Sequence, residues 1–222
     1  MGTNSEMTTQ YPNHKPMNNP LVLLLLTGVG LYFGKLWLDD LRSGANRPAN
    51  GPAALPGATP APTRAIVIAV VGSMVILALE TWGEIALGLA GEQSKMTGLF
   101  ALYSIAAAPL VEEIIFRGYL VVNPEKRGRS LAWVAAFGAS LLFAALHPFL
   151  WKNDDAGFAF TLGAKGWFST AAVFATSMWL YAARLAAWNP QRSLLPCFAG
   201  HAAKNLGVFA VKAATGFVAS WW

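Results

Sequence analysis

The feature that most constrains this chain is a series of long apolar runs separated by short polar clusters. A helix needs about 20 mainly apolar residues to cross a bilayer, and runs of this kind recur along the whole sequence. Charged residues make up only 12% of the chain, against roughly 25% in a typical soluble domain, which argues against an ordinary water-soluble enzyme. The pattern predicts an all-α fold, that of a polytopic integral membrane protein with about six transmembrane helices.

The apolar runs divide the chain into four parts. Residues 1–19 form a polar N-terminal tail, and residues 20–38 form the first transmembrane helix. Residues 39–64 are rich in Pro, Ala, Gly and Asn without periodicity, which is typical of a linker. Residues 65–222 form a membrane-embedded domain. Its further spans are expected at 65–90, 98–122, 131–150, 167–188 and 194–222.

The net charge of +5 comes from Lys and Arg residues that lie mostly at the ends of the apolar runs. They form no stripe or patch interleaved with aromatic residues, so we expect membrane lipids as partners and no nucleic acid. With six spans, most of these cations fall on one side, which the positive-inside rule makes cytoplasmic, with both termini outside. The cations on that side are Lys35, Arg42, Arg47, Arg64, Lys126, Arg127, Arg129, Arg184 and Arg192.

A few charged residues remain inside the apolar runs, where each is costly unless it is paired or solvated and so marks a functional site by default. Glu113 and Arg117 are four residues apart with the acid first, a spacing that favours an ion pair on one helix face. Glu112 points about 100° away from Glu113 and is left without that partner. An unpaired carboxylate in apolar surroundings suits a general base.

Two histidines also lie inside predicted helices, His147 and His201. Asn205 follows His201 by four residues, so both side chains face one direction. Pro109, three residues before Glu112, removes a backbone hydrogen bond and is expected to kink its helix and open a water-accessible cavity.

Three motifs therefore stand in order on separate apolar runs: Glu112-Glu-x-x-x-Arg117, Phe143-x-x-x-His147 and His201-x-x-x-Asn205. This arrangement resembles the CPBP family of intramembrane proteases, also called the CAAX protease and bacteriocin-processing or Abi family. The resemblance covers about residues 101–211. It implies hydrolysis of a peptide bond in a membrane-associated protein, peptide or C-terminal tail, by a four-helix catalytic core that runs from residue 98 to the C-terminus.

The resemblance also implies roles for single residues. Glu112 would be the base that activates water, assisted by His147. His201 and Asn205 would bind the oxyanion. Glu113 and Arg117 would be structural partners that hold the first motif helix in place.

The cofactor is left open by the sequence. Glu112, His147 and His201 could hold a zinc ion with an open fourth position. However, no HExxH motif is present, and each histidine could equally donate a hydrogen bond to an oxyanion. We prefer the metal-free, glutamate-type interpretation to the metal-dependent one.

Other functions and residues need weighing beside this one. A non-proteolytic membrane scaffold or immunity protein that keeps the family fold is the main alternative, and a transporter with a proton relay is another. The complete motif set favours the protease, and the compact length favours a prokaryotic cytoplasmic (inner) membrane. Cys197 could form a thiol–imidazole dyad with His201, but a buried small hydrophobe is the preferred interpretation. Glu80 and Glu84 share a helix face and receive no role.

Overall fold

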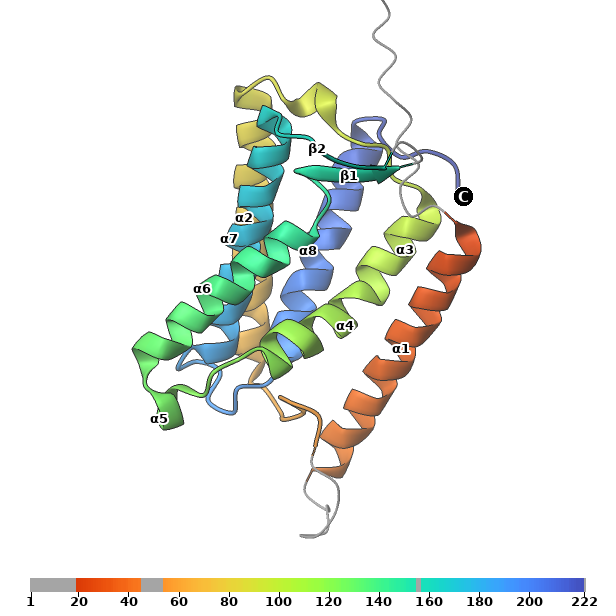
Figure 1. Cartoon of the computed structure of the whole chain (residues 1–222). Coiled ribbons are helices and arrows are strands. Elements are labelled where there is room, and N and C mark those ends of the chain that lie inside the picture. The colour runs from red at the N-terminus through yellow and green to blue at the C-terminus, as the bar shows by residue number, and fades with distance from the viewer. Residues whose placement is uncertain (1–18, 45–53, 155–156, 222) are drawn as a thin grey trace, which may run out of the picture.

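The computed structural model describes residues 19–44, 54–154 and 157–221, which form a bundle of helices with one small hairpin (Figure 1). The predicted tail up to residue 18 and the part of the predicted linker from 45 to 53 lie outside the described residues. The division of the chain into a tail, a helix, a linker and a domain therefore stays a prediction.

Each of the predicted spans coincides with a helix or a helical segment. The elements are α1 (Pro20–Ser43), α2 (Thr63–Ala86), η1 (Ala90–Glu92), α3 (Gly98–Ala106), α4 (Ala108–Glu113), η2 (Ile114–Tyr119), α5 (Pro124–Arg127), α6 (Arg129–Leu146), β1 (Trp151–Asp154), β2 (Gly157–Phe160), α7 (Ala164–Leu185) and α8 (Leu195–Ala214). By length and composition, 4 segments of the described chain are able to cross a membrane: Pro20–Ser43, Thr63–Ala86, Gly98–Arg127 and Arg129–Leu146. The all-α membrane fold is thus confirmed.

Side-chain contacts at both ends of helix α1 determine where it begins and ends. The Asn19 side chain accepts a hydrogen bond from the backbone of Leu21, which caps the first turn. At the other end the helix continues past the predicted limit at residue 38. Lys35 and Asp39 form an ion pair of 2.5 Å one turn apart, and the Ser43 hydroxyl bonds the Asp39 carbonyl at 2.8 Å. These local contacts extend a helix whose end cannot be placed from hydropathy alone.

The third predicted span is interrupted between α3 and α4, and it then continues as a π-helix. Helix α3 stops at Ala106, and α4 starts at Ala108 with Pro109 in its first turn, so the expected interruption at the proline is present. After Glu113 the chain forms the π-helix η2, whose end is marked by a bond of 2.9 Å from the Leu120 amide to the Ile115 carbonyl. A π-turn of this kind re-aims the side chains around it and is frequent at functional sites.

All five spans predicted after the first are too long at their C-terminal ends, and the chain after α6 and α8 shows why. Helix α6 ends at Leu146 rather than at residue 150, just before Pro148, and the chain then forms the hairpin β1–β2, with Trp151 opposite Phe160. Helix α8 ends at Ala214 rather than at residue 222. Gly216 adopts a left-handed conformation with φ of 79°, which turns the chain back. Residues 217–220 then bond with residues 96–98 at the start of α3.

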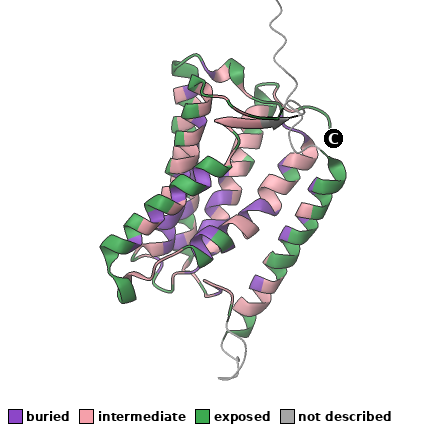
Figure 2. Ribbon diagram, viewed as in Figure 1, coloured by how far each residue is buried: buried purple, intermediate pink, exposed green. Residues whose placement is uncertain are grey.

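The main hydrophobic core lies where α1, α2, η2, α7 and α8 meet, and the outer faces of the helices are exposed (Figure 2). Many of the exposed side chains are large and apolar, such as Leu25, Leu79, Val134 and Leu141. A surface of this kind is costly in water and suits contact with lipid.

The loops between the helices sort the cations to one end of the bundle. The end of α1, the start of α2, α5, the end of α7 and the start of α8 lie at the lower end in Figure 1. Described cations that the sequence assigns to the cytoplasm, such as Arg42, Arg64 and Arg127, belong to these segments, and Arg192 lies in the loop between α7 and α8. Which face of the membrane they occupy stays a prediction.

Candidate active site

The candidate residues come from four elements. Glu112 and Glu113 end α4, Arg117 lies in η2, His147 is the first residue after α6, and His201 and Asn205 lie on α8. The following contacts bring Glu113, Arg117 and His201 into one network and place Glu112 and His147 at its border.

Glu113 is the centre of the buried network. Its side chain is fully buried, and Oε1 accepts hydrogen bonds from Nη1 of Arg117 at 3.1 Å and from Nδ1 of His201 at 2.7 Å. The expected ion pair with Arg117 is therefore present. The bond to His201 means that Nδ1 carries the hydrogen, because the carboxylate can only accept, so that Nε2 is the ring nitrogen that faces the remaining groups.

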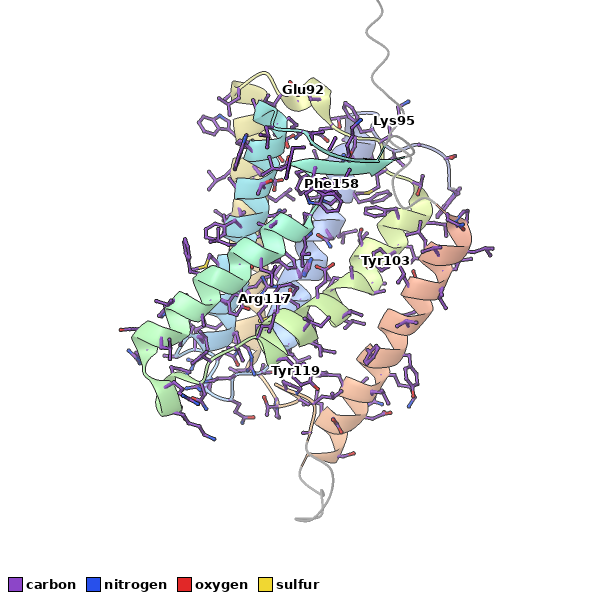
Figure 3. All side chains as sticks on the ribbon, in the orientation of Figure 1. Glu92, Lys95, Tyr103, Arg117, Tyr119 and Phe158 are labelled. Carbon is purple, nitrogen blue, oxygen red and sulfur yellow. The ribbon has the colours of Figure 1, made fainter. Side chains whose placement is uncertain are left out.

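Arg117 is fixed from several sides at the middle of the bundle, where Figure 3 labels it. Its Nη2 donates to the Ser177 hydroxyl at 2.6 Å and to the Ser177 carbonyl at 3.2 Å. The guanidinium also lies over the rings of Phe143 and Tyr181, at 4.7 and 5.0 Å from their centroids. Helix α7 thus holds the first motif helix in place through contacts that Arg117 makes.

Helix α7 also satisfies the backbone of the π-turn. The Tyr181 hydroxyl donates to the Phe116 carbonyl at 2.6 Å, and Nε of Arg184 donates to the Arg117 carbonyl at 3.0 Å. A buried carbonyl without a hydrogen-bond partner would destabilise the fold. These two side chains therefore stabilise the π-helix η2 in the core by bonding its carbonyls.

Glu112 has a different environment from its neighbour. Its side chain is 27% exposed, and Oε2 lies 3.8 Å from Nε2 of His201, which is beyond hydrogen-bond distance. The carboxylate of Glu112 is therefore partly exposed beside His201 and is not held in a buried ion pair.

His147 is held by its own helix. Its Nδ1 lies 2.8 Å from the Phe143 carbonyl, and since a carbonyl can only accept, Nδ1 donates and Nε2 is free to accept in the neutral ring. The Phe143 ring is buried and lies 4.7 Å from the ring of His147 and 6.3 Å from that of His201, between centroids. The Phe143 ring therefore lies against both imidazoles and connects His147 to the network at His201.

Asn205 lies one turn beyond His201 and is half-buried. Its Nδ2 donates to the Ser104 carbonyl at 2.6 Å, which ties α8 to α3. One of the two amide hydrogens is used in this bond, and the other remains for a further acceptor.

The sequence left a zinc site open, and the cofactor stays a prediction. Among the described residues, no group of three or more His, Cys, Asp and Glu side chains is arranged to hold a metal ion. Nδ1 of His147 and Nδ1 of His201 are each committed to an acceptor, so Nε2 is the ring nitrogen that each histidine presents to other groups.

Several supporting residues escaped the sequence analysis. Ser177 and its partner Ser140, whose hydroxyls are 2.9 Å apart, give no sequence signal, because serines pack in helices of any kind. Lys204 does give a signal, since it is a cation inside an apolar run next to Asn205. It pairs with Glu80 of α2 at 2.8 Å.

Cys197 is fully buried and its thiol faces the Leu180 carbonyl at 3.3 Å, in agreement with a packing role.

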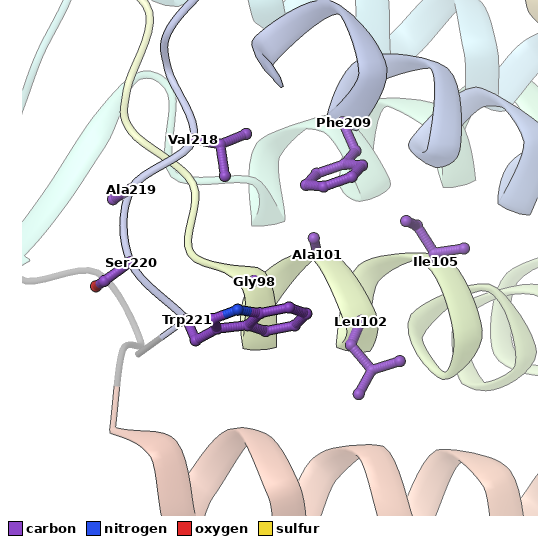
Figure 4. Close-up of a pocket in the computed structure, with 9 residues that line it drawn as sticks. All are labelled: Gly98, Ala101, Leu102, Ile105, Phe209, Val218, Ala219, Ser220 and Trp221. Atoms are coloured by element: carbon purple, nitrogen blue, oxygen red, sulfur yellow. The ribbon is translucent and has the colours of Figure 1, made fainter.

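A cavity of about 370 Å³ lies between α3, the end of α8 and the C-terminal segment, and none of the candidate residues lines it (Figure 4). Its lining is mostly apolar: Gly98, Ala101, Leu102, Ile105, Phe209, Val218, Ala219, Ser220 and Trp221. Ile105 follows Ser104, the partner of Asn205, and Phe209 lies one turn after Asn205. The cavity therefore neighbours the α3–α8 contact that Asn205 makes.

The bundle and its buried Glu–Arg–His network define an integral membrane protein with a candidate hydrolytic site. A family model described as type II CAAX prenyl endopeptidase Rce1-like matches residues 94–207. The chain belongs to this family of intramembrane proteases, and the match confirms the resemblance that the three motifs indicate. No curated protein and no solved structure matches the chain significantly.

Proposed function

We propose that this protein is an intramembrane endopeptidase that hydrolyses a peptide bond by glutamate-activated water. One observation carries the proposal. Two adjacent glutamates lie in opposite environments: Glu113 is buried in an ion pair, while Glu112 is partly open beside His201. A carboxylate that is available at such a place is what a general base requires.

The reaction would give each polar group of the site a role. Glu112 takes a proton from a water molecule, assisted by the free Nε2 of His147, and the water oxygen attacks the carbonyl carbon of the scissile bond. The second amide hydrogen of Asn205 donates to the oxyanion that forms, and so does Nε2–H of His201 in the doubly protonated imidazole with which the cycle starts and ends. When the carbon–nitrogen bond breaks, Glu112 returns its proton to the leaving amine.

We prefer this chemistry without a metal ion. The support is the arrangement of the described donors, which does not bring Glu112, His147 and His201 into a ligand set. The expected result is that chelators leave cleavage by the purified protein unchanged. Loss of cleavage with a chelator and its return with zinc would contradict this preference.

The substrate that fits best is a membrane-associated protein or C-terminal tail that carries an apolar group. The description of the family names CAAX prenyl substrates, and the cavity beside Asn205 has an apolar lining of a suitable kind. Ala101→Phe would fill part of this cavity. We expect it to raise KM for a prenylated peptide about tenfold and to change KM for the unprenylated peptide little. The membrane in question would be the cytoplasmic membrane of a prokaryote.

The direct test uses wild type, Glu112→Ala and the matched control Glu92→Ala, since Glu92 is an exposed glutamate of η1. Each is reconstituted in vesicles and incubated with prenylated and unprenylated tail peptides, and the products are identified by mass spectrometry. Wild type and Glu92→Ala should cleave, and Glu112→Ala should not. Equal processing by all three would support a non-proteolytic scaffold and overturn the proposal.

A further inference from the structure

Helices α2 and α8 touch along a seam that glycines make narrow. A Cβ atom at Gly200 would lie 2.9 Å from the Ser73 hydroxyl, and one at Gly207 would lie 2.3 Å from a Leu77 methyl. Only glycine allows the two helices to approach this closely. Lys204 lies on α8 between these two glycines, so its long cationic side chain interrupts a seam of small residues.

Lys204 is held in this seam by an ion pair. Its residue is only 6% exposed, and Nζ lies 2.8 Å from Oε2 of Glu80 on α2. Removing two charges from water is expensive, and apolar side chains of similar volume would pack the same seam at least as well. Packing alone therefore does not account for the pair.

Lys204 stands beside two of the candidate active-site residues on α8. Lys204 lies on the same helix as His201 and immediately before Asn205. Its charge is one of those that act on His147, together with Glu112 from α4 and His201 from α8. Glu80 belongs to a different helix, which carries none of the candidate catalytic residues, and lies outside the residues that match the family model.

Resting on the function proposed above, we propose that Lys204, held by Glu80, is a positioning residue of the active site that supplies a fixed positive charge. In peptide hydrolysis a negative charge develops on the carbonyl oxygen beside His201 and Asn205. A cation that is already fixed near these groups stabilises that charge without having to reorganise during the reaction.

The test exchanges the two charges. Lys204→Met removes the cation, Lys204→Arg keeps it, and the double variant Glu80→Lys with Lys204→Glu keeps an ion pair but reverses its direction. The matched control is the second ion pair of α2, between Glu84 and Lys165, exchanged in the same way. For each protein, kcat, KM and the thermal unfolding midpoint are measured in vesicles or micelles.

We expect Lys204→Met to lower kcat at least tenfold with little change in KM, and Lys204→Arg to retain most of kcat. The exchange of Glu80 and Lys204 should restore the unfolding midpoint but leave kcat low, whereas the exchange of Glu84 and Lys165 should leave kcat unchanged. If the exchange of Glu80 and Lys204 restores kcat together with stability, the pair is only a clamp and the proposal is overturned.

A second readout does not depend on peptidase activity. In protein labelled with ¹⁵N-histidine, the ring nitrogens of His147 report the local charge, and His147→Asn assigns its signals. At a fixed pH, loss of the cation in Lys204→Met should move these signals toward the protonated ring, whereas the Glu84 and Lys165 exchange should not. Unchanged His147 signals in Lys204→Met would overturn the proposal, even if wild type cleaved no peptide and the proposed function failed by itself.

Discussion

Two halves of the site meet at consecutive residues, yet they are built in opposite ways. The anchored half consists of Glu113, Arg117 and Ser177, whose charged side chains are fully buried and bound to one another. The open half consists of Glu112 and His147, of which the glutamate side chain is 27% exposed. His201 belongs to both, since Nδ1 binds Glu113 and Nε2 faces Glu112.

The difference teaches how one short motif can serve both stability and chemistry. A buried charge is tolerated only when partners satisfy it, and such a charge is then unavailable for reaction. The open half leaves its carboxylate and one imidazole nitrogen without strong partners, which suits groups that must exchange protons. Because the π-turn begins directly after Glu113, the anchored half holds the helix at the point where the open half needs a fixed direction.

The largest effect is expected from breaking the anchored half at Arg117. Arg117→Met leaves Glu113 as a buried charge without its cation, which should cost about 3–5 kcal/mol of unfolding free energy. Unfolding in micelles, followed by circular dichroism against denaturant, would measure this loss. A variant as stable as wild type would show that the ion pair does not hold the bundle.

The next largest effect is expected in the open half, at His147, and it is a loss of activity rather than of stability. His147→Ala removes the acceptor that assists Glu112, so kcat should fall about 100-fold or more. Its unfolding free energy should stay near that of wild type, because the half-buried ring bonds only its own helix. Steady-state kinetics and the same unfolding assay are needed together. A marked fall in the unfolding free energy of His147→Ala would show that the open half also holds the structure, which contradicts the prediction.

The smallest effect is expected at Ser177, the outer member of the anchored half. Ser177→Ala removes one hydroxyl acceptor from Arg117 and leaves the Ser177 carbonyl in place, so about 1–3 kcal/mol of unfolding free energy should be lost. Lys204 and the open half are untouched, and kcat at a temperature well below unfolding should remain within about threefold of wild type. A larger fall in kcat would mean that the two halves are coupled.

Local spacing predicted much of this arrangement. The helical spans followed from apolar runs, and the Glu113–Arg117 pair followed from a separation of four residues on one helix. Glu112 was expected to lack that partner because it points elsewhere on the same helix.

Contacts between distant segments were beyond such reasoning. The bond between Glu113 and His201 joins residues far apart in sequence, and the π-turn that follows Glu113 depends on Tyr181 and Arg184 from α7. The end of α8 was placed too late, since the apolar residues after Gly216 fold back as an extended segment instead of continuing the helix. Hydropathy does not distinguish these two uses of apolar sequence.

The central claim is that Glu112 acts in catalysis while Glu113 holds the structure. Glu112→Gln and Glu113→Gln make the same change at adjacent positions, so turnover of a tail peptide by Glu112→Gln, measured beside its unfolding midpoint, tests the claim most directly. The account predicts that Glu112→Gln loses turnover about 1000-fold with a midpoint like that of wild type, whereas Glu113→Gln unfolds more easily. Turnover by Glu112→Gln close to that of wild type would contradict it.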